Sequence, residues 1–217
     1  SIPSGTFDLM QLGVKVTSDV DGAVLGGRDM DALSTGECEA AGTCTAAKIG
    51  SGTTIHRFGR LRLDNAVGSE LLDLPIPART EYWNGSVFIT NTDDKCTTIP
   101  SSSVSLQNYQ PIITSSNMSA QSNLSITGKF DSGKMNTSNL NIFKLKKPNP
   151  TPTGKGSVDV CIRLGTSAIC NASSSANMPW LQGKWNPGSS TYSDDPVSRA
   201  TFGIYKGGPI IYLRELH

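Results

Sequence analysis

Paired aspartates at turns are the first residues in this chain whose types and spacing suit a chemical role. Asp93 and Asp94 lie in a polar turn, and similar pairs occur at 19–21 and 194–195. Carboxylate oxygens at turns are ligands that Ca²⁺ prefers. None of the pairs has the spaced pattern of an EF-hand loop, however. The prediction of calcium at Asp93 and Asp94 therefore competes with solvated turns in which these side chains cap backbone amides.

Four aromatic residues form a second candidate site. Flat aromatic faces bind sugar rings, and side-chain amides near these residues in the sequence can supply hydrogen bonds. The alternative is that the rings pack in the core around the end of the chain, and we favour that interpretation. The candidate ligand-binding residues are Trp83, Trp180, Trp185 and Tyr192.

No catalytic motif accompanies these residues. The chain has two histidines, His56 and His217, and neither has a nucleophile or a carboxylate setting near it in the sequence. The Gly-x-Ser-x-Gly, His-Glu-x-x-His and Walker patterns are absent. A glycan-processing hydrolase needs only two carboxylates and no signature, so it remains the enzymatic alternative. We expect the protein not to be an enzyme, and we expect no cofactor other than calcium.

The five cysteines predict disulfides and an oxidising compartment. Cys38 and Cys44 lie close together in a loop, and Cys161 and Cys170 flank a segment with a hairpin-like pattern. Both pairs are candidate local disulfides. Cys96 is left as an unassigned thiol, which can instead pair with Cys161 or Cys170 or link to another chain. Clustered ligands of the zinc type are absent.

Composition excludes several classes of partner. The chain has 217 residues, with 19 Lys and Arg against 18 Asp and Glu, so its net charge of +1 gives no electrostatic footprint for nucleic acid. No apolar run approaches the roughly 20 residues of a membrane-spanning helix. Charged residues make up only 17%, and Ser, Thr, Asn and Gly replace them. This composition is typical of secreted β proteins and predicts an extracellular or cell-surface location.

The candidate residues lie among short β-type segments. Residues 200–205 and 210–214 are β-branched and aromatic runs separated by Lys-Gly-Gly-Pro, which predicts a terminal hairpin. The Asn84-Gly85 dipeptide predicts another hairpin, and strands are also expected near 124–130, 140–145 and 157–164. In the strand near 58–63, Arg60 and Arg62 share one face, where we expect them to pair with Asp or Glu rather than to bind an anion.

These segments predict an all-β fold, a β-sandwich with immunoglobulin-like or jelly-roll-like connections and long loops. No helix of globular length is indicated. Residues 146–156 are rich in proline and lysine and read as an internal linker. Only about 60 residues follow it, which is marginal for an independent domain. We therefore expect one composite domain over 1–217, forming the C-terminal part of a longer chain.

Two blocks of sequence carry a family resemblance. They are RFGRLRLDNAVGSEL at 57–71 with DKCT at 94–97, and WLQGKW at 180–185 with ATFGIY at 200–205 and IYLRE at 211–215. Together they resemble the C-terminal domain of MshQ-like proteins, bacterial proteins associated with biogenesis of the mannose-sensitive haemagglutinin pilus, a type IV pilus. The chain departs from the family pattern at 98–156 and in its cysteines. The resemblance implies a bacterial envelope or extracellular protein, and it assigns no activity to particular residues.

The sequence therefore predicts a non-enzymatic surface domain of a bacterial pilus or adhesive fibre. Its partners would be other copies of itself or pilus and envelope proteins, without membrane insertion. Assembly is expected to proceed by β-strand addition, in which residues 1–13 or the terminal strand complete a neighbour's open sheet. The alternative is a lectin-like tip adhesin that binds glycans.

Overall fold

The computed structural model describes residues 54–152, 155–166 and 169–203, together with 3, 7–10, 13–14, 20–21 and 47–48. These residues fall into two compact units. The first comprises Ser1–Ile2, Gly59–Tyr82 and Val87–His217, and the second comprises Pro3–Phe58 and Trp83–Ser86. The division separates most of the N-terminal quarter of the chain from the part that carries the two family-like blocks.

The second unit contains two small antiparallel sheets. β1 (Phe7–Met10) pairs with β4 (Thr54–His56), and β2 (Gly13–Val14) pairs with β3 (Ala47–Lys48). The strand that contains Phe7 thus pairs within its own chain.

The regular secondary structure described in the first unit is almost entirely β, as predicted, and its helical segments are single turns. The strands are β5 (Gly59–Leu63), β6 (Ala66–Gly68), β7 (Leu74–Pro75), β8 (Ala78–Trp83), β9 (Phe88–Thr90), β10 (Val104–Gln107), β11 (Leu124–Thr127), β12 (Ile142–Leu145), β13 (Gly156–Ile162) and β14 (Val197–Phe202). The turns are η1 (Ser101–Ser103), α1 (Ala120–Asn123) and η2 (Pro179–Leu181).

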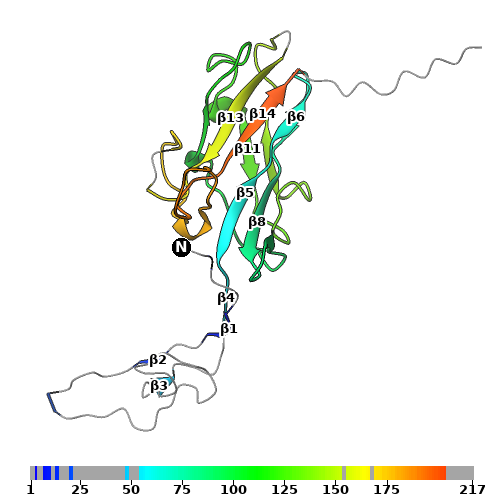
Figure 1. Cartoon of the computed structure of the whole chain (residues 1–217). Helices are drawn as coiled ribbons and strands as arrows, with labels where there is room; N and C mark the ends of the chain where they lie inside the picture. Colours follow the sequence, from blue (N-terminus) through cyan, green and yellow to red (C-terminus); the bar gives the residue numbers. More distant parts are fainter. Residues whose placement is uncertain are drawn as a thin grey trace, which may run out of the picture. The chain divides into compact units, whose positions relative to one another are not determined.

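One layer of this unit is the four-stranded sheet β10-β13-β14-β6, in which Figure 1 labels β13, β14 and β6. β13 is antiparallel to both β10 and β14, whereas β6 lies parallel to β14 with Ala66 opposite Ala200 and Gly68 opposite Phe202. All seven residues of β13 are buried, because its valines and Ile162 face the core while Ser157, Asp159 and Cys161 are covered on the other face. The sheet is thus covered on both sides of its central strand.

The other layer combines the sheets β5-β8-β9 and β11-β12-β7. β7 and β8 behave as one bent strand, because the Ile76 amide donates to the Phe143 carbonyl (2.9 Å) and the Asp64 amide donates to the Pro77 carbonyl (3.0 Å). Pro75 lies in β7 at the edge of its three-stranded sheet, where a residue without an amide hydrogen is tolerated. The resulting order, β5, β7/β8, β12 and β11 against β10, β13 and β14, is that of an immunoglobulin-like sandwich.

A single apolar core joins the two layers. Leu61 and Leu63 of β5 point into it while Arg60 and Arg62 point outward, as the alternation predicted. The largest fully buried side chains include Phe130, Phe143 and Phe202. The core belongs to the first unit and fixes the strands from which the candidate site residues project.

The segment predicted as a linker is attached to the first unit over its described part. The Lys146 amide donates to the Asn123 carbonyl (2.6 Å), the Lys147 amide to the Asp73 carboxylate (3.1 Å), and the Asn149 amide to the Asn117 carbonyl (2.8 Å). Residues 146–149 therefore run along the sandwich and lead from β12 towards β13.

Candidate functional site

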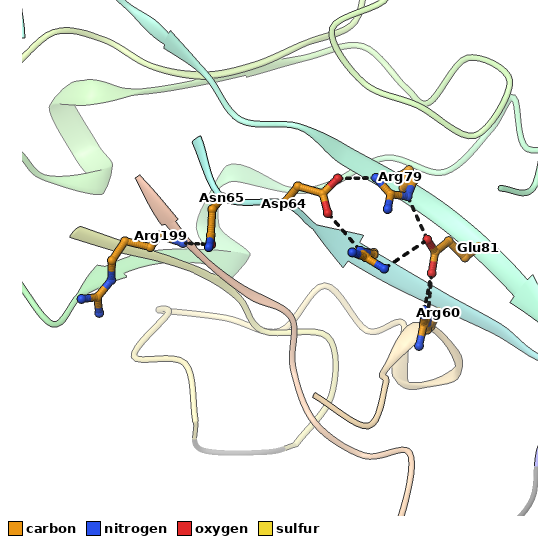
Figure 2. Close-up of polar contacts among 7 residues, drawn as sticks. Arg60, Asp64, Asn65, Arg79, Glu81 and Arg199 are labelled. Carbon is orange, nitrogen blue, oxygen red and sulfur yellow. Dashed lines mark hydrogen bonds and ion pairs between the residues drawn. The ribbon is translucent and has the colours of Figure 1, made fainter. Parts of the chain in front are cut away.

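A network of charged residues covers the outer face of β5 and β8. The antiparallel register places Arg60 opposite Glu81 and Arg62 opposite Arg79. Arg60 donates to Glu81 at 2.7 Å and Arg79 donates to the other Glu81 oxygen at 2.8 Å (Figure 2). Asp64 accepts from Arg62 at 2.9 Å and also from Arg79. The prediction that Arg60 and Arg62 pair with acidic residues is confirmed.

Aromatic rings enclose the guanidinium of Arg60. Its Cζ atom lies 3.7 Å from the ring centroid of Phe88 and 4.6 Å from that of Trp185. Tyr192 extends the cluster, with its ring centroid 6.0 Å from that of Phe88. Stacking between a cation and aromatic faces is attractive and shields the ion pair with Glu81 from water. The cluster joins the long connection between β13 and β14 to the outer face of β5.

This connection, the β13–β14 loop of residues 163–196, is held in place by buried polar groups and by a disulfide. The predicted Cys161–Cys170 bond is present, although residues 163–166 and 169–170, the described part of the segment after β13, form no strand. The Asp195 carboxylate accepts from the Leu164 amide (3.0 Å) and from Gln182 (2.9 Å). Asp194 accepts from the amides of Trp185 and Asn186, both at 3.0 Å. These bonds give the loop a defined shape.

Trp180 lies on the η2 turn of this loop and is 66% exposed. The preference for core packing is therefore wrong for Trp180, because the buried members of the turn region are Leu181 and Gln182. Trp185 and Tyr192 are half-buried around Arg60. Trp83 ends β8, where its amide donates to the Phe58 carbonyl (2.9 Å), and belongs to the other compact unit. Of the four predicted aromatic residues, the described contacts join Trp185 and Tyr192 in one cluster through Arg60 and Phe88.

The acidic pair at 93–94 is divided between two environments. Asp93 is exposed, whereas Asp94 is buried and accepts from the Thr80 hydroxyl (2.8 Å) and from the amides of Cys96 (3.2 Å) and Thr97 (3.0 Å). Asp94 thus caps a turn, which is the competing interpretation of this pair. Among the described residues no group of three or more His, Cys, Asp or Glu side chains is arranged to hold a metal ion.

A comparison with protein-family models gives the chain its family. The model described as DUF6701, fourth domain, matches residues 57–216. The chain belongs to this family. No curated protein and no solved structure matches the chain. The DUF6701 match begins two residues before the first compact unit resumes at Gly59 and extends through the terminal run at 210–214.

The predictions for the other three cysteines have different outcomes. Cys96, close to the start of the DUF6701 region's polar middle, is a free and exposed thiol. Its pairing with Cys161 or Cys170 is excluded because these two residues are bonded to each other. Cys38 and Cys44 lie outside the described residues, so their pairing stays a prediction. No helix in the described part of the chain is long and apolar enough to cross a membrane.

We expect buried turn caps to make the DUF6701 domain sensitive to acid. Burial raises the pKa of Asp94, but the bonds from Thr97, Thr80 and Cys96 outweigh it and hold this pKa below its usual 3.8. The pKa of Asp194 is likewise lowered, because bonds from Ser189, Asn186 and Trp185 outweigh burial.

A carboxyl whose pKa is depressed on folding stabilises the protein above its unfolded pKa and loses that contribution as the pH falls through the folded pKa. The Asp94→Asn variant should therefore be less stable than wild type at pH 7, by about 1–2 kcal/mol. The difference should shrink below about pH 4. Urea unfolding at pH 7 and pH 3 measures it, and an equal difference at both pH values would contradict the capping role.

Proposed function

We propose that the chain is a non-enzymatic surface domain of a bacterial pilus or envelope structure and that it assembles by β-strand addition. In this proposal it corresponds to the C-terminal domain of MshQ-like proteins, as the blocks at 57–71 and 180–185 suggest. Its partners are other copies of itself or pilus and envelope proteins. The buried Cys161–Cys170 bond supports an extracellular location, because such bonds persist in oxidising compartments.

The observation that carries the proposal is the environment of β14. The terminal hairpin predicted from the sequence needs a free edge of this strand for residues 210–214, which lie outside the described residues. One edge of β14 is paired with β13 over its full length, from Val197 to Phe202. The other edge is paired with β6 from Ala200 to Phe202. Both edges of β14 are therefore occupied from Ala200 to Phe202, the part of the strand that the hairpin would use, and we infer that the terminal run, which has strong β propensity, pairs elsewhere.

Of the two donor segments that the sequence suggests, the terminal one is the better candidate. Residues 7–10 of the N-terminal arm form β1 and already pair with β4. The terminal run lies within the matched DUF6701 domain, which reaches residue 216. Main-chain hydrogen bonds from such a run to an open sheet edge can link one copy to the next.

Electron microscopy of the purified chain tests this function. We expect filaments or short oligomers for the full chain and single particles for a chain that ends at Gly203. The truncation removes only residues that follow β14, so the described sandwich stays complete. Single particles for both proteins at all concentrations would rule out assembly by the terminal run.

The exposure of Trp180 favours a second candidate function, glycan binding at a tip. Its indole stands on a loop that a disulfide and two buried carboxylates hold in place, and such preorganised aromatic faces suit sugar rings.

For this candidate we expect Trp180→Ala to abolish binding on a glycan array while leaving the unfolding midpoint unchanged, because the side chain is mostly exposed. Ile169→Ala, at another exposed apolar residue of the same loop, is the matched control and should bind like wild type. The absence of glycan binding by wild type itself would remove the candidate.

A further inference from the structure

The geometry points to the outer edge of β6 as the acceptor and to residues 210–214 of a second copy of this chain as the strand that pairs there. This inference rests on the proposed strand addition and adds to it a defined acceptor edge. β6 is the last strand of the described four-stranded sheet, so only one of its sides is paired. A fifth strand beside it would extend the sheet without displacing a described element.

The opposite edge of the same sheet is covered. The Gln107 side chain of β10 donates to the Ile169 carbonyl (3.2 Å) and accepts from the Asn171 amide (3.2 Å). Just before β10, the Ser102 carbonyl accepts from the Ser174 amide (3.1 Å). The β13–β14 loop therefore runs along the β10 side of the sheet, as natural sheets often protect their edges. The β6 side has no such cover among the contacts of the described residues.

Apolar side chains are exposed at the β6 edge. Val67, the central residue of β6, is 57% exposed, and Leu71 and Leu72 in the turn that follows are also exposed. The incoming run, Ile-Ile-Tyr-Leu-Arg at 210–214, is apolar and β-forming. In contrast, β11 at the edge of the other layer has half-buried Leu124, Ser125 and Ile126 and presents no large exposed apolar residue. Burial of Val67 would favour addition at β6 over addition at β11.

Topology argues that the strand comes from another copy. β6 and β14 are parallel, so the chain leaves both strands at the same end, where Gly68 lies opposite Phe202. Residues 203–209 are long enough to reach the far side of β6, since two strand spacings are about 10 Å. To do so, however, they would have to cross the segment that leaves β6 at Ser69. Proteins avoid connections that cross at one edge of a sheet, and a strand from a second copy has no such crossing to make.

A disulfide-trapping experiment on the full chain tests the acceptor edge. Cys38, Cys44 and Cys96 are first changed to serine, and the buried Cys161–Cys170 bond is kept. One preparation then carries Val67→Cys, and a second, with a different affinity tag, carries Ile210→Cys, Ile211→Cys or Tyr212→Cys. After mixing and mild oxidation, we expect a covalent dimer that contains both tags. Because side chains alternate along a strand, Ile211→Cys should behave differently from Ile210→Cys and Tyr212→Cys.

The matched control replaces Val67→Cys by Ser125→Cys on β11, which should give no covalent dimer with any partner. A further variant carries Val67→Cys and the terminal cysteine in one chain. Cross-linking only within that chain would overturn the inference, and so would equal trapping at Ser125→Cys or no trapping at Val67→Cys.

Sedimentation of the same mixtures separates the two proposals. If oligomers form but Val67→Cys is not cross-linked, the β6 edge is not the acceptor, and strand addition at another edge still stands. If no oligomers form, strand addition itself is disproved.

Discussion

Replacing Glu81 by alanine is expected to lower the free energy of unfolding by about 3 kcal/mol, because Glu81 is buried and its loss leaves the partly buried Arg60 guanidinium without its counter-charge. The Glu81 side chain is 5% exposed and receives Arg60 and Arg79 at 2.7 and 2.8 Å. Arg60 is also enclosed by Phe88 and Trp185, which limits its access to water. Chemical denaturation at pH 7 measures the change.

The control for this variant is Arg62→Ala. Arg62 reaches Glu81 only at 4.0 Å, and its side chain is 41% exposed. An exposed ion pair contributes less than about 1 kcal/mol, so this change should be small. If Glu81→Ala cost no more than Arg62→Ala, the network would be a surface feature and would not be what anchors the β13–β14 loop to β5.

Removal of the Cys161–Cys170 bond by the double change Cys161→Ala and Cys170→Ala should cost about 2.5–3 kcal/mol. The bond closes a loop whose ends are nine residues apart, and closure of a loop of this size restricts the unfolded chain by about that amount. Both cysteines are buried, so the loss of packing adds to the effect. Thermal unfolding of the variant without reductant measures the sum.

The exposed thiol provides the matched control for that experiment. Cys96→Ser removes a sulfur that forms no disulfide and is exposed, so it should leave the unfolding midpoint within experimental error. A similar loss of stability in both variants would mean that the Cys161–Cys170 bond does not order the β13–β14 loop.

The sequence predicted the strands whose two faces differ in polarity. The alternation around Leu61 and Leu63 placed Arg60 and Arg62 on the outer face correctly. Their partners could not be named, because Glu81 is 21 residues from Arg60 and only the register of β5 and β8 brings the two together. The sequence of β8 did carry one signal for this pairing, because alternation places Arg79 and Glu81 on the same face of that strand.

Two strands, β10 and β6, could not be predicted from the sequence, for different reasons. β10 was not predicted because Ser103 and Ser105 are buried around Val104, and this mixture reads as a loop. β6 has only three residues, and its parallel pairing with β14 depends on strands about 130 residues apart in the sequence. That pairing occupies one edge of β14 at Ala200–Phe202, whereas residues 204–214 of the expected terminal hairpin lie outside the described residues.

The most direct test of the central claim is sedimentation velocity over a concentration series for three proteins. These are the full chain, a chain that ends at Gly203 and a chain that lacks residues 1–13. Strand addition by the terminal run predicts concentration-dependent oligomers for the full chain and for the chain without residues 1–13, and a monomer for the chain that ends at Gly203. Oligomers of equal size in all three proteins, or a monomeric full chain at every concentration, would contradict it.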